Sequence, residues 1–163
     1  MANDSDNPQE PWYLGPRAEL LARLYLTRRD DLLIWPNFPD RGQDLLVEIL
    51  RDGQRTGRLF AIRVQAALSR EVSEPPVLSL SAPQSGIYRD LPYPAIVLLF
   101  TVDNDAGFFR WLKAPAPGTP GALTLLEDEG ALTPFTNETL AGIIEDVSRW
   151  YDARAAAALT TTA

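Results

Sequence analysis

The sequence predicts an α/β (α+β) protein in which a single mixed central sheet is flanked by helices. An N-terminal segment has apolar residues at helical spacing, short apolar runs separated by turn residues follow, and an amphipathic segment ends the chain. At 163 residues the chain can bury one substantial core. We expect a disordered leader over residues 1–12, one domain over 13–154 and a flexible tail over 155–163.

Two elements and a loop are expected first. Residues 14–29 place apolar side chains three or four positions apart, which is the spacing of one helix face. The run 32–35 is short, apolar and ended by Pro36, and it predicts a strand. Residues 37–43 contain proline and glycine and are expected to form a loop.

An antiparallel hairpin is expected next. Residues 45–50 form its first strand, and Asp52-Gly53 is a turn dipeptide that favours a tight return into a second strand over 57–67. Prolines interrupt residues 77–81 and 87–88, whose structure the pattern leaves open.

The centre of the sheet is expected in the second half of the chain. Residues 95–102 are almost continuously apolar, as is typical of a strand buried on both faces. A further strand is expected over 108–112, after a turn-forming segment.

The last third of the chain is expected to end in a helix. Residues 114–121 form a Pro/Gly linker, and 123–126 can add a small strand. Asn137 is a candidate N-cap for an amphipathic helix over 137–154.

Composition excludes several chemistries. The chain has no cysteine and no histidine, which rules out disulfides, thiol catalysis, Cys/His zinc sites and histidine-based triads. A metal site would need oxygen ligands and a hard ion such as magnesium, manganese or calcium. No apolar run approaches the roughly 20 residues that span a bilayer, and residues 1–10 lack a signal-peptide pattern. We therefore expect a cytoplasmic protein without membrane contact.

The charge distribution bears on partners. The net charge of −7 argues against a general nucleic-acid coat protein. Residues 17–70 carry ten arginines against seven acidic residues, a net of +3, so the remainder carries five basic against fifteen acidic residues, a net of −10. A locally basic face is compatible with this split. We expect a protein partner rather than nucleic acid, and self-association stays open.

Four stretches of the chain form an ordered set of motifs. They are Arg17-Ala18-Glu19-Leu20-Leu21-Ala22, Asp40-Arg41-Gly42-Gln43-Asp44-Leu45, the segment 57–65 ending in Val64-Gln65, and the apolar segment 91–99 followed by Phe109-Arg110-Trp111-Leu112. In order and spacing they resemble the PD-(D/E)xK, or restriction-endonuclease-like, superfamily. More narrowly, they resemble the bacterial domain-of-unknown-function family numbered four-three-six-five.

This resemblance implies a divalent-metal site. It implies that Glu19 points at the metal from the first helix, that Asp44 stands at the mouth of one strand and that Gln65 stands on the next. Together these side chains would form an oxygen-rich half-shell for Mg²⁺, the ion that neutralises charge and acidifies water in phosphodiester hydrolysis.

The lysine that would complete this motif is missing. Its position reads Ala67, and losing a positioned catalytic group of this kind costs roughly 10²–10⁴-fold in rate. Arg63 shares the strand face of Gln65, but a guanidinium is a poor proton acceptor. Lys113, the one lysine of the chain, is distant in sequence.

Each candidate residue also has an ordinary structural interpretation. Glu19 can pair with Arg23 at i,i+4 on a solvated helix face. Asp44 can serve only as a turn or strand cap. Gln65 can be a half-buried amide whose hydrogen bonds are satisfied.

The missing lysine favours binding over catalysis. We expect a catalytically degenerate nuclease-like domain that acts as a binding or regulatory module, in a prokaryotic defence or mobile-element setting. One alternative is an active divalent-metal-dependent nuclease with a relocated cation. Another is an acidic protein-interaction or immunity-like module.

Overall fold

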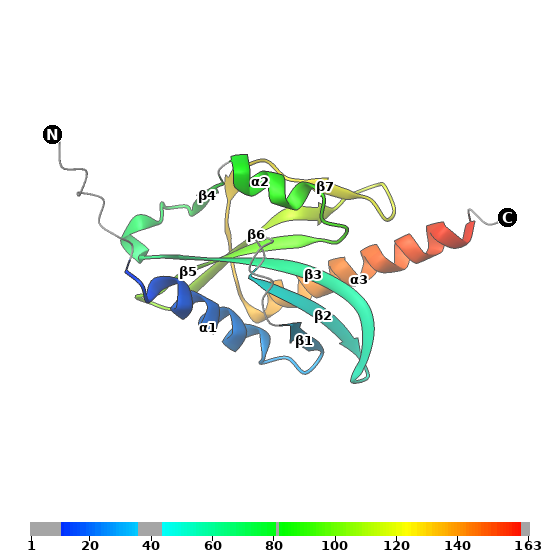
Figure 1. Cartoon of the computed structure of the whole chain (residues 1–163), viewed down its shortest axis with the longest axis horizontal. Helices are drawn as coiled ribbons and strands as arrows, with labels where there is room; N and C mark the ends of the chain where they lie inside the picture. The colour runs from blue at the N-terminus through cyan, green and yellow to red at the C-terminus, as the bar shows by residue number, and fades with distance from the viewer. Residues whose placement is uncertain (1–10, 36–43, 81, 161–163) are drawn as a thin grey trace.

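The protein is mixed α+β and is built on one main sheet (Figure 1). The computed structural model describes residues 11–35, 44–80 and 82–160. Within these ranges the sheet runs β1-β2-β3-β5-β6-β7, and β9 pairs with β6. Its strands are β1 (Leu32–Trp35), β2 (Leu45–Arg51), β3 (Gln54–Ala67), β5 (Ala95–Thr101), β6 (Ala106–Pro115), β7 (Leu123–Leu125) and β9 (Thr133–Pro134).

A smaller sheet and the helices complete the described structure. Strands β4 (Val77–Ser79) and β8 (Glu129–Ala131) form an antiparallel pair. The helices are α1 (Leu14–Leu26), α2 (Ala82–Arg89) and α3 (Asn137–Thr160). None of the described helices is long and apolar enough to cross a membrane.

The hairpin and the apolar core strand share the main sheet, as the sequence predicts. Asp52 and Gly53 both have positive φ, the backbone geometry of a tight two-residue hairpin turn, and β2 and β3 pair antiparallel on either side of it. Strand β3 then pairs in parallel with β5 along its last seven residues, 61–67. Every residue of β5 is buried. The central position expected for residues 95–102 is therefore confirmed.

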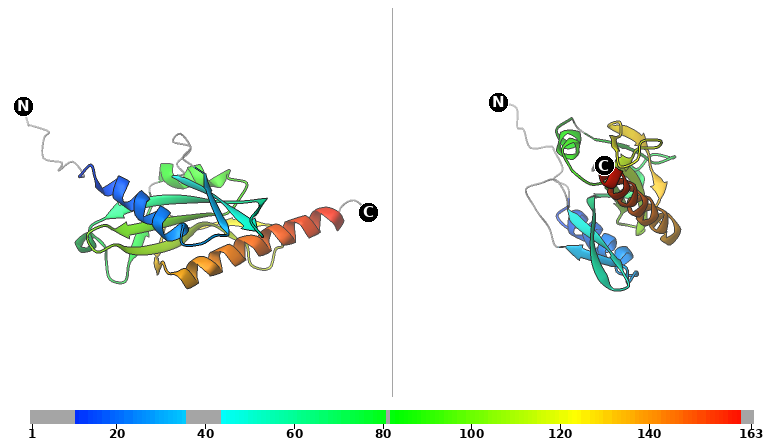
Figure 2. Two further views of the ribbon diagram at one scale, coloured as in Figure 1. Left: turned by 90° about the horizontal axis from the view of Figure 1, so that it is seen from below. Right: turned by 90° about the vertical axis from the view of Figure 1, so that its right-hand side faces the viewer.

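The two faces of the sheet are covered by different elements (Figure 2). Helices α1 and α3 pack against the face that carries the even-numbered positions of β3, from Phe60 to Ala66. The opposite face carries Ala61 and Ala67 and is covered by Tyr88 of α2 and Leu78 of β4. Alternation along β3 places Arg63 and Gln65 on this second face.

Helix α3 differs from the expectation at both ends. Thr136 caps it, because its hydroxyl accepts the Thr139 N–H at 3.2 Å, so the predicted cap at Asn137 is one residue late. The helix also continues through Thr160, where a flexible tail was expected from residue 155. Its last turns extend past the sheet, and Leu159 is 78% exposed (Figures 1 and 2). Residues 161–163 lie outside the described part.

Other differences are local. Strand β3 starts at Gln54 rather than at residue 57, because the two-residue turn lets pairing begin at once. Residues 87–88 belong to helix α2, whose helical pattern the neighbouring prolines obscured in the sequence. The loop 37–43, with most of the motif that precedes Asp44, and the leader 1–10 lie outside the described residues.

Candidate functional site

The candidate site lies where β3 extends beyond the start of β2. The pairing of β2 with β3 ends at Leu45 and Ile62, whereas β3 stays paired with β5 as far as Ala67. After Ile62, the edge of β3 that faces away from β5 therefore has no β2 residue paired with it. Asp44 stands at this point, because it immediately precedes β2.

Both carboxylate oxygens of Asp44 contact groups of β3. The Asp44 N–H donates to the Ile62 carbonyl at 3.0 Å, which continues the β2–β3 ladder by one bond. The Val64 N–H then donates to Asp44 Oδ2 at 2.6 Å. The second oxygen, Oδ1, lies 3.7 Å from Nη1 of Arg63. The side chain of Asp44 thus takes the place of a strand partner at the open edge of β3.

A cavity of about 300 Å³ adjoins this edge. It is lined by Gly15 of α1 and by four consecutive residues of β3, from Arg63 to Ala66. Gln65 lines this cavity two residues after Arg63, on the strand face that alternation predicts. That Asp44 and Gln65 act together stays a prediction.

Glu19 lies on the helix that covers the other face of the sheet. It is half-buried on α1, one turn after Gly15, so the two residues share a side of the helix. Helix α1 covers the face that carries Val64, whereas Asp44 and Gln65 point to the opposite face. The three predicted ligands therefore do not project from one face of the sheet. A cation bound by all three would have to lie at the edge of β3, between the two faces.

Tyr88 is a site residue that the sequence did not reveal. It lies on α2, is 2% exposed, and is close enough to Asp44 and Arg63 for their charges to affect its pKa. Burial raises the pKa of Tyr88 to about 12, with Arg63 lowering it and Asp44 raising it. The phenol is therefore protonated at neutral pH. Tyr88 thus brings an uncharged phenol near the Asp44–Arg63 pair.

No cation occupies the place of the missing lysine among the described residues. Ala67 packs with the apolar cluster on the α2 side, and its carbonyl accepts the Val102 N–H at 3.0 Å. Lys113 lies opposite Ala95, at the other end of the parallel pairing from Ala67. Its Nζ donates to the Arg89 carbonyl at 2.7 Å and to the Leu91 carbonyl at 2.5 Å. Lys113 thus holds the segment after α2 against β6.

These contacts do not fit a bound Mg²⁺. A magnesium ion takes oxygen ligands in near-octahedral geometry, but Asp44 already accepts a backbone N–H and faces a guanidinium. Within residues 11–35, 44–80 and 82–160, no group of three or more acidic side chains is arranged to hold a metal ion. The arginine beside Asp44 would also repel a second cation. The site is suited to hydrogen bonding and charge recognition.

A second carboxylate on the same face of β2 is structural. Glu48 is 1% exposed and accepts three hydrogen bonds, from Gly57 N–H at 2.9 Å, Trp35 Nε1 at 3.2 Å and Arg55 Nε at 3.1 Å. Burial pushes the pKa of Glu48 up, but the donors, led by the Gly57 N–H, outweigh burial and leave the pKa below its ordinary value. Glu48 fixes the β1–β2–β3 ribbon that carries Asp44.

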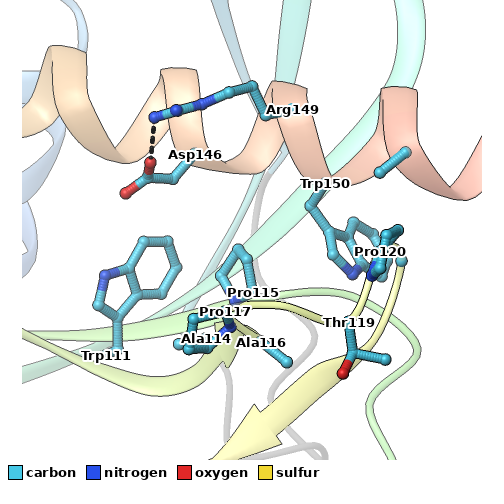
Figure 3. Close-up of a pocket in the computed structure, with 12 residues that line it drawn as sticks. Trp111, Ala114, Pro115, Ala116, Pro117, Thr119, Pro120, Asp146, Arg149 and Trp150 are labelled. Atoms are coloured by element: carbon cyan, nitrogen blue, oxygen red, sulfur yellow. Dashed lines mark hydrogen bonds and ion pairs between the residues drawn. The ribbon is translucent and has the colours of Figure 1, made fainter.

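A larger cavity, of about 420 Å³, lies between α3 and the β6–β7 connection (Figure 3). Trp111 and Trp150 face it together with Pro115 at the end of β6 and Pro117 and Pro120 of the connection. Asp146 and Arg149 lie at its rim and pair with each other at 2.7 Å. Their charges are therefore already matched, and this cavity carries no comparable polar chemistry.

Comparisons with known proteins do not assign the chain to a family. No family model, no curated protein and no solved structure matches the chain.

Proposed function

We propose that this chain is a catalytically degenerate nuclease-like domain that acts as a binding module. The observation that carries the proposal is the use of Asp44 inside the fold: one oxygen accepts the Val64 N–H and the other faces Arg63. A carboxylate held in this way stabilises the strand edge, and its two contacts compete with a catalytic metal for its oxygens. The architecture, a mixed sheet with the hairpin beside the buried strand β5, is consistent with the restriction-endonuclease-like resemblance.

The residues around Asp44 also support the loss of catalysis. Ala67 stands where the resemblance requires a lysine, and the amine of Lys113 is held by two carbonyls at the other end of the sheet. Arg63 supplies positive charge, but a guanidinium is a poor proton acceptor and so a poor base for an attacking water. Asp44, the carboxylate at this strand edge, is engaged by the Val64 N–H and Arg63, which disfavours its use as a general base.

A protein partner suits the charge of the chain better than nucleic acid does. The net charge of −7 opposes the approach of a polyphosphate backbone and favours basic or mixed surfaces. We propose a cytoplasmic binding or regulatory role in a prokaryotic defence or mobile-element setting, which rests on the family resemblance alone.

A cleavage assay tests the proposal. Purified protein is incubated with duplex and single-stranded DNA and RNA in the presence of Mg²⁺ or Mn²⁺, and the expected result is no cleavage above the protein-free background. The Ala67→Lys variant restores the lost position, and it is also expected to stay inactive because Asp44 remains committed to Val64 and Arg63. Metal-dependent cleavage by the unmodified protein that Asp44→Ala abolishes would overturn the proposal and establish the nuclease alternative.

A further inference from the structure

Another cavity lies at the end of the main sheet where β3 and β5 stop. It has a volume of about 400 Å³ and is lined by the segment after β3, by the end of β5 with the turn that follows it, and by one residue each of β6 and β9. Strands β3 and β5 are parallel, so their carboxyl ends both lead into its walls. Ligands of α/β proteins commonly bind at the carboxyl ends of parallel strands. This position makes the cavity a candidate binding site.

Part of the cavity wall is apolar. It consists of Val72, Pro76, Phe108 and Pro134. Val72 and Phe108 also pack with the apolar cluster on the α2 side, so this part of the wall is anchored in the fold. Both are only partly buried. The wall can therefore receive the aliphatic stem of a ligand, and an aromatic ring such as that of Phe108 also attracts a cation over its face.

Asn104 presents a hydrogen-bond donor in the polar part of the wall. Its Oδ1 accepts the Ala106 N–H at 3.2 Å and the hydroxyl of Thr101, a buried residue. A backbone N–H can only donate, which fixes the oxygen at this end of the Asn104 amide. The amide nitrogen, Nδ2, has no partner among the described residues. It is thus free to donate to an acceptor on a ligand.

Glu74 is the one charged residue among the described residues that line the cavity. Its side chain is exposed, and its carboxylate forms no ion pair or hydrogen bond in the part of the chain that the structure describes. The wall segments 69–76 and 101–108 carry four acidic residues against one basic residue, a net of −3. Arg17 offsets one of these charges by pairing with Asp105. The surroundings of the cavity therefore favour a cation.

The two serines of the wall are already engaged within the fold. The hydroxyl of Ser69 donates to the Asp103 carboxylate, and that of Ser73 donates to the Pro75 carbonyl at 3.0 Å. What the cavity offers a ligand is therefore one unpaired carboxylate, one amide N–H and an apolar wall with an aromatic ring.

We propose that this cavity binds a basic side chain, of lysine or arginine, from a partner protein. The charged end would pair with the Glu74 carboxylate, and the aliphatic stem would lie against the ring of Phe108. The backbone carbonyl of the same partner residue would accept the N–H of Asn104 Nδ2. One basic residue of a polypeptide thus complements all three groups. This inference gives the partner of the proposed binding module a chemical feature, and it rests on that proposed function.

Other occupants match fewer of these groups. A hard metal ion takes about six or more oxygen ligands, and within the described residues no group of three or more acidic side chains is arranged to hold one. A nucleic acid would bring phosphates to a wall of negative net charge. A free alkylamine supplies the charge and the stem but has no acceptor for Asn104 Nδ2.

Short peptides test the inference. The probes are end-blocked tripeptides with lysine or arginine between two alanines, and the control is the same tripeptide with norleucine, which keeps the stem without the charge. Two-dimensional NMR of the backbone amides of the full chain measures affinity and shows where the probe binds. We expect a basic peptide to bind roughly fivefold or more tightly than the norleucine peptide, with shifts centred on residues 69–76 and 101–108. Butylamine should bind about threefold more weakly than the lysine peptide, because it offers no carbonyl.

Two matched variants identify the carboxylate. Glu74→Gln should weaken binding of the basic peptides by about threefold to fivefold and leave the norleucine peptide unaffected. Glu71→Gln removes the same charge from the same segment, but Glu71 does not line the cavity, and glutamine keeps an oxygen for the Leu68 N–H. It should change binding far less. Both side chains are exposed, and circular dichroism checks that the fold is retained.

Several results would overturn the inference. Equal binding of the lysine, arginine and norleucine peptides is one, and equal losses in the two glutamine variants are another, because they would indicate only general surface charge. Butylamine that binds as tightly as the lysine peptide would make a small amine the occupant. If the peptides fail to bind and no nucleic acid is cleaved, this site is lost while the degenerate nuclease-like domain stands. Metal-dependent cleavage that Asp44→Ala abolishes would instead overturn that domain's proposed function and leave the binding data at this cavity intact.

Discussion

Replacing Asp44 with alanine is expected to destabilise the protein, which distinguishes a structural carboxylate from a metal ligand. A carboxylate kept for catalysis often costs stability, and its removal then stabilises the fold. In this structure Asp44 holds the Val64 N–H at 2.6 Å and lies 3.7 Å from the Arg63 guanidinium. Alanine would leave a backbone donor at the strand edge without its acceptor.

The size of the effect follows from these two contacts. A hydrogen bond to a charged acceptor contributes about 1.5–3 kcal/mol. The ion pair adds about 0.5 kcal/mol, because both side chains are partly exposed, at 21% and 29%, and 3.7 Å is long for direct contact. We therefore expect Asp44→Ala to lower the free energy of unfolding by about 2–3.5 kcal/mol. Asp44→Asn keeps an acceptor oxygen and should cost about 1 kcal/mol.

Urea unfolding followed by tryptophan fluorescence and circular dichroism measures these differences. Glu145→Ala is the matched control, because Glu145 pairs with Arg149 at 3.7 Å on the surface of α3 and its loss should change stability by no more than about 0.5 kcal/mol. An Asp44→Ala protein as stable as the unmodified chain, or more stable, would refute the structural assignment. Loss of measurable Mn²⁺ binding in the same variant would assign Asp44 to a metal site.

The remaining predictions concern Glu48 and Gly130. The folded pKa of Glu48 is depressed, so its contribution to stability is present above its ordinary pKa of 4.5 and is lost as the pH falls through the lower folded value. Glu48→Gln should therefore make stability fall less steeply below about pH 4.5, as measured in acid titrations followed by circular dichroism. An unchanged loss of stability below this pH would contradict the prediction. Gly130→Ala should cost about 1 kcal/mol in urea unfolding, since its Cβ would lie 2.5 Å from Cζ of Arg110 and would displace the guanidinium from the Glu127 and Glu129 carbonyls. Gly142→Ala, in open space on α3, should be neutral or stabilising, and equal losses at the two glycines would exclude the clash as the cause.

Local patterns determined most of the secondary structure. The turn dipeptide Asp52-Gly53 and the alternating residues on either side of it predict the hairpin, because turn geometry and side-chain alternation act over a few residues. The apolar run 95–102 predicts a buried strand for the same reason. Helix α2 was missed because its prolines hide a short helical pattern whose packing comes from distant elements.

The candidate site shows where this reasoning stops. Alternation alone places Gln65 and Ala67 on one face of β3, and the structure agrees. The face on which Glu19 arrives depends on how α1 packs on the sheet, which no local pattern contains. Tyr88 joins the site for a similar reason, since the crossover from β3 to β5 carries α2 over that face.

The sequence by itself determined the class of the fold, the hairpin, the buried strand and the absence of a lysine at position 67. Only the tertiary structure decided what Asp44 does. Its carboxylate accepts the N–H of a residue 20 positions away, because β2 begins where β3 continues without a partner from that strand. Hydrogen bonds between distant residues depend on strand register and on the ends of the strands, and these are set by the packing of the whole sheet.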